Sequence, residues 1–276
     1  MLPTLYRVWC RARRHVAAEW EDAHCRKYFW ASKDKSSERA VRLQGLQAEL
    51  ARARGHHAAG LLTDLAKAYE YADHCKLVQF ARQHGFPGDI LAVCLGMYSG
   101  PRRIVTQGLC STWFSADGQT IVAGCGMATT LLKVYTLTLF DAICKWHPQV
   151  DIHVYVDDVD LFTVSPSMRT ASTNLTNAAD FLLAMFEKAL RLQVAHHKCV
   201  LLASSAKVEV QVRKDIRHKP HIACVQLQSW GKKLGIQFGL RGRRHAMLLK
   251  QRTTKAKLRA ARIAKIRRAA GARTRT

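Results

Sequence analysis

Two adjacent aspartates interrupt an apolar, strand-like segment in the second half of the chain. The segment 154–161 reads VYVDDVDL and contains Asp157 and Asp158. Aspartate is a favoured turn residue, so this pair taken alone fits either an ordinary hairpin turn or a metal site. An upstream strand-like segment, 58–64, ends in a third aspartate, Asp64. Two strands that bring carboxylates to one point form the arrangement that two-metal phosphoryl transfer needs.

The elements around these aspartates predict how they are positioned. A β-hairpin is expected to hold Asp157 and Asp158 in its tight turn. The order strand, helices, two strands, helix, strand is typical of a split βαβ, or ferredoxin-like, layer in an α+β fold. In that layer the first strand lies beside the hairpin, which brings Asp64 to Asp157, and the helices cover one face of the sheet. The elements are expected at 58–64, 73–85, 89–97, 121–145, 150–156, 159–164, 171–191 and 199–203.

The flanking segments carry weaker signals. Residues 1–57 are expected to be helical and basic. Two short strands are expected to pair around Gly108, and three more are expected after the last core strand. These strands are predicted at 102–106, 110–115, 208–212, 221–228 and 234–238.

The charge of the chain points to a polyanionic partner. Its 276 residues carry a net charge of +24 and are 48% hydrophobic, which favours a folded basic protein. From residue 241 onwards there are 14 Lys and Arg and no Asp or Glu. Nucleic acid is the leading candidate partner and an anionic membrane surface the second. The basic end fits a solvated run, a nuclear address or a nucleic-acid clamp.

The cysteines and the apolar segments indicate where in the cell the protein is expected. Nine cysteines without a C-x-x-C pair indicate reduced thiols in an intracellular protein, in the nucleus or the cytoplasm, and argue against a structural zinc site. The apolar segment 121–144 is interrupted by Lys133 and Asp141. It is therefore interpreted as a buried helix, and no membrane partner is expected.

Residues 61–238 resemble the reverse transcriptase domain of retroelements, most like the polymerases of non-LTR (LINE-type) retrotransposons. The first motif is Asp64 with Tyr69 five residues later, and the catalytic hairpin is the sequence YVDD at 155–158. The following helix-and-lysine element extends through Lys198, and the sequence WGKKLG at 230–235 is similar to the primer-gripping element. These motifs occur in the order found in that family.

The resemblance implies a role for each charged motif residue. Asp64, Asp157 and Asp158 would bind two Mg²⁺ ions, with Mn²⁺ as an alternative. One ion would activate the primer 3′-hydroxyl and the other would neutralise the triphosphate and the leaving pyrophosphate. Lys198 would approach the departing pyrophosphate as a cation or proton donor.

The resemblance also implies binding residues. Tyr69 would lie under the incoming sugar and exclude a 2′-hydroxyl. The residues that would bind the nucleotide are Tyr69, Leu65, Gly124 and Arg103. The primer grip would consist of Trp230, Gly231, Leu234 and Gly235. One departure from the family is Ala123, which stands where the family usually has Gln.

The resemblance divides the chain into four parts. These are a partial fingers-like helical region (1–57), a polymerase palm with the carboxylates (58–205), primer-grip-like strands with the start of a thumb (206–240), and a basic tail (241–276). Because the chain begins close to the first motif, it is expected to be a truncated copy that lacks part of the fingers. No endonuclease or RNase H region is recognisable.

Three functional hypotheses remain open at this point. The first is an RNA-directed DNA polymerase that uses an RNA template, a DNA primer and deoxynucleoside triphosphates. The alternative is an inactive reverse-transcriptase remnant that binds RNA or DNA through its basic surface. A basic chromosomal or ribosomal RNA-binding protein is the third, but it leaves Asp64 and Asp157 unexplained.

Overall fold

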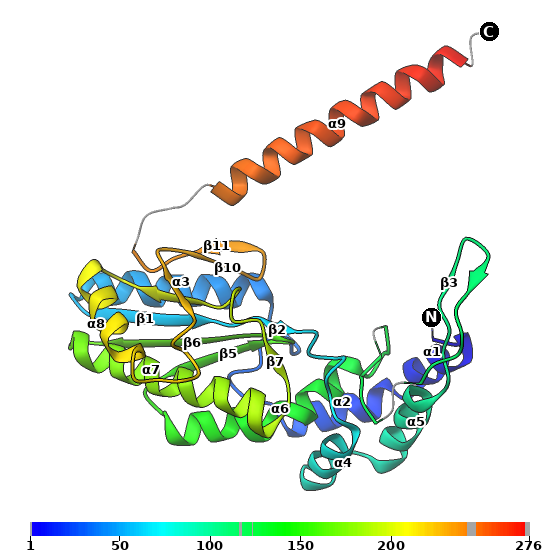
Figure 1. The fold of residues 1–276 in the computed structure, drawn as a ribbon, viewed down its shortest axis with the longest axis horizontal. Coiled ribbons are helices and arrows are strands. Elements are labelled where there is room, and N and C mark those ends of the chain that lie inside the picture. The colour runs from blue at the N-terminus through cyan, green and yellow to red at the C-terminus, as the bar shows by residue number, and fades with distance from the viewer. Residues whose placement is uncertain (1, 116–117, 123, 242–246, 274–276) are drawn as a thin grey trace.

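The computed structural model describes residues 2–115, 118–122, 124–241 and 247–273, and its main sheet has five strands (Figure 1). The strand order is β5-β6-β1-β8-β9, and all pairs are antiparallel except β8 with β9. The first strand therefore lies beside the hairpin, as predicted. The strands span His57–Leu62 (β1), Asp151–Tyr155 (β5), Asp158–Ser165 (β6), Val200–Ala203 (β8) and Gln226–Gln228 (β9).

Both faces of this sheet are covered. Ala59 and Leu61 of β1 belong to the main core, whereas Ala58 and Leu62 belong to a second, smaller one. Helices lie on opposite sides of the sheet, with α3 on the second face (Figure 1). The prediction of helices on one face only is wrong, because β1 is apolar on both sides and each side needs cover. The first face carries α6 (Ala128–Trp146), α7 (Met168–Ala184) with its π-helical turn η1 (Met185–Ala189), and α8 (Ala206–Ile216); the second carries α3 (Ser37–Ala53), β10 (Gly231–Lys233) and β11 (Ile236–Phe238).

A helical end extends the molecule beyond the sheet (Figure 1). It contains α1 (Thr4–Ala12), α2 (Arg14–Ala23), α4 (His74–Gln83) and α5 (Gly88–Ser99), and α4 packs on α6. Helices α1 to α3 confirm the helical prediction for the first 57 residues.

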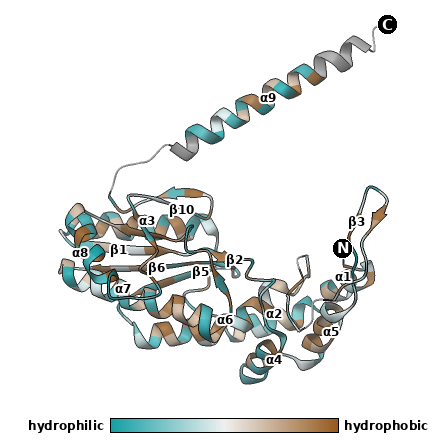
Figure 2. Cartoon of the chain, viewed as in Figure 1, coloured by the Kyte–Doolittle hydropathy of each residue, from teal (hydrophilic) through white to brown (hydrophobic). Residues whose placement is uncertain are grey.

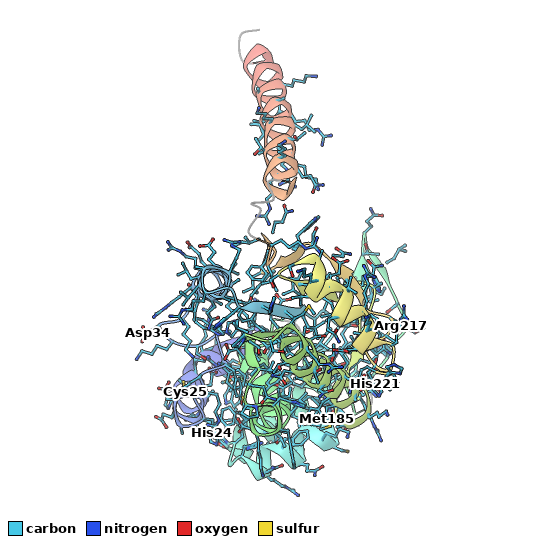
Figure 3. The ribbon with its side chains drawn as sticks, turned by 90° about the vertical axis from the view of Figure 1, so that its left-hand side faces the viewer. His24, Cys25, Asp34, Met185, Arg217 and His221 are labelled. Carbon is cyan, nitrogen blue, oxygen red and sulfur yellow. The ribbon has the colours of Figure 1, made fainter. Side chains whose placement is uncertain are left out.

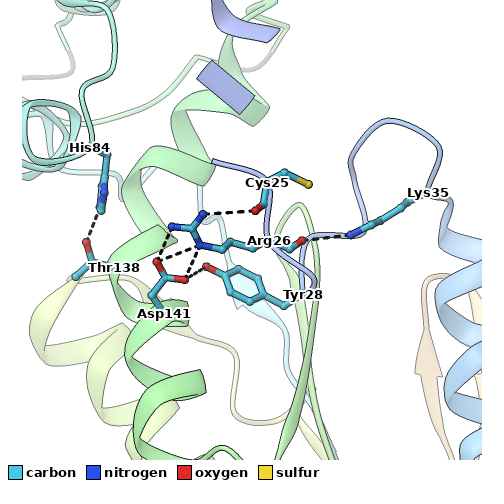
Figure 4. Close-up of polar contacts among 7 residues, drawn as sticks. All are labelled: Cys25, Arg26, Tyr28, Lys35, His84, Thr138 and Asp141. Carbon is cyan, nitrogen blue, oxygen red and sulfur yellow. Dashed lines mark hydrogen bonds and ion pairs between the residues drawn. The ribbon is translucent and has the colours of Figure 1, made fainter. Parts of the chain in front are cut away.

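Residues 24–35 connect this helical end to α6 and to the sheet. Arg26 Nε lies 3.1 Å from Asp141 Oδ1, and the Tyr28 hydroxyl donates to the same oxygen at 2.7 Å (Figure 4). The backbone N–H of Trp30 donates to the carbonyl of Val154 on β5. Residues 24–35 therefore bind both α6 and the sheet.

Besides the β10–β11 pair, two short strand pairs lie outside the main sheet. β2 (Leu65–Ala66) pairs with β7 (Gln193–Val194), and β3 (Val105–Thr106) pairs with β4 (Leu109–Cys110). The β3–β4 pair confirms the predicted hairpin around Gly108, although the strands are shorter than predicted.

The predicted strand at 208–212 is wrong, because these residues lie in α8. The side chain of Ser205 caps the helix by accepting from the Val208 N–H. Val208, Val212 and Ile216 are buried on one helical face, a four-residue spacing that the local alternation of valine with polar residues conceals. In the predicted strand 221–228 only Gln226–Gln228 is a strand, whereas the predicted strand at 234–238 is confirmed by β11.

The last helix, α9 (Met247–Arg273), projects from the side of the body that carries β10 and β11 (Figure 1). Its described side chains, residues 250–266, are exposed and radiate around the helix (Figure 3). None of the helices described for this chain is long and apolar enough to span a bilayer.

Candidate active site

The register of β1 on β6 positions Asp64. In this pairing Leu62 faces Asp160, and the backbone N–H of Thr63 donates to the carbonyl of Val159 at 2.9 Å. The hydroxyl of Thr63 donates to the same carbonyl at 2.6 Å. The antiparallel contact therefore continues through Thr63, and the next residue, Asp64, lies near enough to Asp158 for their charges to interact.

The turn between β5 and β6 carries the other two aspartates. Tyr155 and Asp158 form the last pair of the hairpin, so the two-residue loop consists of Val156 and Asp157. Val156 has φ of 63°, in the left-handed region that a β-branched residue rarely adopts. Strained backbone of this kind is found at functional sites. The turn thus presents Asp157 at its tip and Asp158 at the start of β6.

The charges of these carboxylates act on one another. Burial raises the pKa of Asp158 to about 6, and the charges of Asp157, Asp160 and Asp64 act in the same direction. Burial, followed by the charge of Asp157, raises the pKa of Tyr69 to about 12. A concentration of negative charge that raises a carboxyl pKa favours the binding of cations.

Lys198 supplies one cation to this site. Its Nζ donates to Asp64 Oδ1 at 3.3 Å, and both side chains are partly exposed. The loop that carries Lys198 is fixed to the same aspartate, since the N–H of Ala195 donates to the Asp64 carbonyl at 2.9 Å. The structure therefore brings together Asp64 and Lys198, which are 134 residues apart in the sequence.

The carboxylates lie near one another, but they do not form a complete metal-binding site. Among the residues that the structure describes, no three Asp, Glu, His or Cys side chains are arranged to hold a metal ion. Asp64 is instead paired with Lys198. The donor set itself consists of carboxylate oxygens, the ligands that Mg²⁺ prefers.

The predicted nucleotide-binding residues are placed in two regions. Leu65 is buried in β2, and the carbonyl of Tyr69, just beyond it, accepts from the N–H of Ile121 at 2.7 Å. This contact holds the loop that leads to Gly124 beside Tyr69. Gly124 is exposed with φ of 84°, and Ala123 lies outside the described residues. Arg103 lies elsewhere, in the segment that leads into the β3–β4 hairpin.

The predicted primer-grip residues lie over the end of β1. Gly231 packs so closely on Leu62 that a Cβ added to it would lie 2.7 Å from the Leu62 Cδ1. Trp230 precedes β10, and Leu234 and Gly235 form its turn with β11, both at positive φ. The hairpin therefore lies on the end of β1, two residues before Asp64.

Three charged residues near the site were not predicted. Lys233 is buried and its Nζ lies 2.6 Å from Asp160 Oδ2; it also donates to the side chain of Gln44 on α3. Burial raises the pKa of Asp160, and the charge of Lys233 acts against that shift. Lys232, the neighbour of Lys233, is exposed, and its charge acts against the rise in the pKa of Asp158. The signal in the sequence was Asp160 inside the apolar strand β6, whereas the sequence of β10 does not distinguish Lys233 from Lys232.

Comparison with known proteins supports the fold. No family model and no curated protein matches the sequence. Apo telomerase from Candida tropicalis, truncated from its C-terminal domain, has a similar structure with a TM-score of 0.54, at 13% identity over 73% of this chain and 41% of that chain. Telomerase from Candida albicans, in complex with a TWJ fragment of telomeric RNA, gives a TM-score of 0.54 at 12% identity over 85% of this chain and 38% of that one.

At these identities the likeness establishes the fold alone. The chain has a mixed α+β fold with an antiparallel-rich sheet, similar to that of these telomerase structures. It spans less than half the length of these two telomerase chains.

Proposed function

We propose that this chain is an RNA-directed DNA polymerase domain of a retroelement of the non-LTR type. It would add deoxynucleotides to the 3′-hydroxyl of a DNA primer on an RNA template. The observation that carries the proposal is that Asp64 follows β1 and Asp158 begins the neighbouring strand β6, near enough for their charges to interact, in a fold similar to that of telomerase. The motif order in the sequence supports the finer assignment to a retroelement.

The aspartates are the residues that would hold two divalent ions, Mg²⁺ or Mn²⁺, in this proposal. When bound, such ions activate the primer hydroxyl and stabilise the charge of the triphosphate. Burial raises the pKa of Asp158 and repulsion from the neighbouring aspartates adds to the rise; bound cations would relieve that repulsion, which supports this role.

Lys198 and Tyr69 would act on the nucleotide. The ammonium of Lys198, 3.3 Å from Asp64, can offset the charge of the triphosphate and donate a proton to the leaving pyrophosphate. Tyr69 lies within the electrostatic range of Asp157, and its backbone holds the loop that follows Thr120. Its ring would lie under the incoming sugar and exclude a ribonucleotide.

A second candidate function is an inactive remnant that binds RNA or DNA through its basic surface. The observation that favours it is that no three acidic, histidine or cysteine side chains in the described part of the chain form a ready metal cluster. The net charge of +24 would support nucleic-acid binding in either case.

Primer extension distinguishes the two functions. The purified chain with a primed RNA template, deoxynucleotides and Mg²⁺ is expected to extend the primer. Asp157→Asn should abolish extension because it removes a charged oxygen ligand, while template binding stays within about twofold. Asp151→Asn is the matched control, since Asp151 is exposed at the other end of β5 and should extend normally. If all three proteins bind template and none extends the primer, the chain is a remnant.

A further inference from the structure

The segment 102–114 forms an arm at the helical end of the molecule. Its base is closed by two backbone hydrogen bonds: the N–H of Arg102 donates to the Phe114 carbonyl at 2.8 Å, and the N–H of Phe114 donates back at 2.9 Å. β3 and β4 form its tip. The arm projects from the helical end of the molecule, beside α1 and α5 and apart from the five-stranded sheet (Figure 1). It is therefore a defined element remote from the candidate active site.

The arm exposes aromatic rings next to arginines. Trp113 is 63% exposed and Phe114 is 46% exposed. The guanidinium carbon of Arg103 lies 5.0 Å from the centroid of the Trp113 ring, which is a cation–π contact. Large apolar side chains exposed together mark a binding surface, since burying them in a partner is favourable. The described core does not use these rings.

A cavity of about 450 Å³ lies between the arm and the helices. The arm contributes Arg102, Arg103, Trp113 and Phe114 to its wall, and Met97 at the end of α5 contributes an apolar side chain. No acidic residue lines it among those described. A volume of this size lies in the range of about 300 to 1,000 Å³ that small ligands fill. The aromatic rings can stack on a flat, uncharged ring of the ligand. The arginines, with no carboxylate beside them among the described residues, can bind an anion attached to that ring.

We propose that this arm is a binding site for single-stranded nucleic acid. An unpaired base would stack on Trp113, a second aromatic surface is available at Phe114, and Arg102 and Arg103 would contact the adjoining phosphates. Stacking is tolerant of sequence because every base has a flat face, which suits a template strand of any sequence. The assignment of that strand as template rests on the proposed function; the binding of a single strand does not.

Charge favours nucleic acid over a second copy of this chain. Each copy carries a net charge of +24 over its whole chain, and like charges oppose association. The exposed Ile104, Val105 and Leu109 near the tip are the side chains that a protein partner would bury. The test therefore includes self-association as an outcome.

A pair of exposed tryptophans provides the test. Trp113→Ala removes the proposed stacking ring. Trp146→Ala is the matched control, because Trp146 is 66% exposed and also has a lysine, Lys145, 5.7 Å from its ring. The affinity of the full chain for a fluorescent single-stranded oligouridylate is measured by anisotropy, without nucleotides or Mg²⁺. Trp113→Ala should lose about 5- to 150-fold, the equivalent of one stacked base, and Trp146→Ala less than about twofold.

Two further measurements complete the experiment. Trp113→Phe should recover most of the affinity, and a fully paired RNA duplex should bind the wild type and Trp113→Ala equally. Equal single-strand affinities for the two alanine variants would overturn the proposal. So would sedimentation that shows a dimer lost on Trp113→Ala, since the arm would then join two copies. Primer extension by the same samples is scored separately: binding that depends on Trp113 in a chain that never extends a primer retains the site and rejects the polymerase.

Discussion

Single residues decided how far the sequence could predict the site. Asp64, Asp157 and Asp158 were chosen because they lie at or near the ends of apolar strands, and the pairing of β1 with β6 brings Asp64 near Asp158. The pairing of Asp160 with Lys233 was not predictable, because the two are 73 positions apart and their contact depends on where the β10–β11 hairpin packs. The residue types in the sequence therefore indicated the kind of chemistry, whereas tertiary packing determined which side chains pair.

The acid sensitivity of the fold is expected to depend on His153. This β5 side chain is buried against Trp30, and its Nδ1 has no hydrogen-bond partner among the described residues. Burial, assisted by the charges of Lys233 and Lys35, lowers its pKa to about 3. Because the folded pKa lies below the unfolded value near 6.5, His153 costs no stability above pH 6.5. Stability is then lost as the pH falls from about 6.5 towards 3.

His153→Phe should remove this loss. At pH 5 the difference from the wild type is expected to be about 2 kcal/mol of unfolding free energy, on top of any offset seen at pH 7. Urea unfolding at the two pH values measures it. His15→Gln, at an exposed histidine of α2, serves as the control and should follow the wild type at both. A parallel pH dependence for His153→Phe and the wild type would contradict the assignment.

At the scale of elements, a helix or strand was predictable where its apolar residues recur with one period. It was not predictable where they fit both the helical and the strand period. The β5–β6 hairpin and α7 follow single periods, and the structure confirms both. The sequence of α8 carries valine at every second position as well as at every fourth, and the cap at Ser205 together with burial on one helical face selects the helix. The second layer on β1 was also missed, because a strand with two apolar faces does not specify what covers it.

The β10–β11 hairpin is expected to depend on its buried ion pair. Lys233→Met leaves the carboxyl of Asp160 buried without its partner, and such single changes cost about 3 to 5 kcal/mol. Lys233→Met combined with Asp160→Leu removes both polar groups and should recover most of that loss. Urea unfolding of the single and double variants, in a double-mutant cycle, gives the coupling.

An exposed ion pair provides the comparison. Lys67→Met breaks a contact of 3.1 Å with Glu70 in which both side chains are more than half exposed. Exposed pairs contribute about 0 to 1 kcal/mol, so this variant should remain close to the wild type. Additive effects of Lys233→Met and Asp160→Leu would mean that the two residues do not stabilise the hairpin as a pair.

At the scale of the whole molecule, charge is distributed unevenly. Helix α9 has no acidic residue, and its described side chains are exposed on all sides. Hydrophilic and hydrophobic residues alternate along the described part of the helix, so its basic residues are spread over its length (Figure 2). An exposed helix of this kind suits contact with phosphates that does not depend on sequence.

Removal of residues 242–276 is expected to weaken nucleic-acid binding and to reduce its salt dependence. Each lost phosphate contact should lower the slope of log affinity against log salt by about 0.7 for a single strand. Titrations at several salt concentrations measure the slope for the full and shortened chains. The shortened chain keeps Arg241, which is paired with Glu209 of α8, so the body should remain intact. An unchanged slope would exclude α9 from phosphate contact.

The central position of β1 has a consequence for folding kinetics. Asp64 meets its neighbours only after β1 has paired with β6, about 100 residues later, and with β8, about 140 residues later. Loops of that length close slowly, because their entropy is lost before the contacts that repay it are formed. During refolding, the acidic cluster should therefore assemble in a late step, after the local helices have formed.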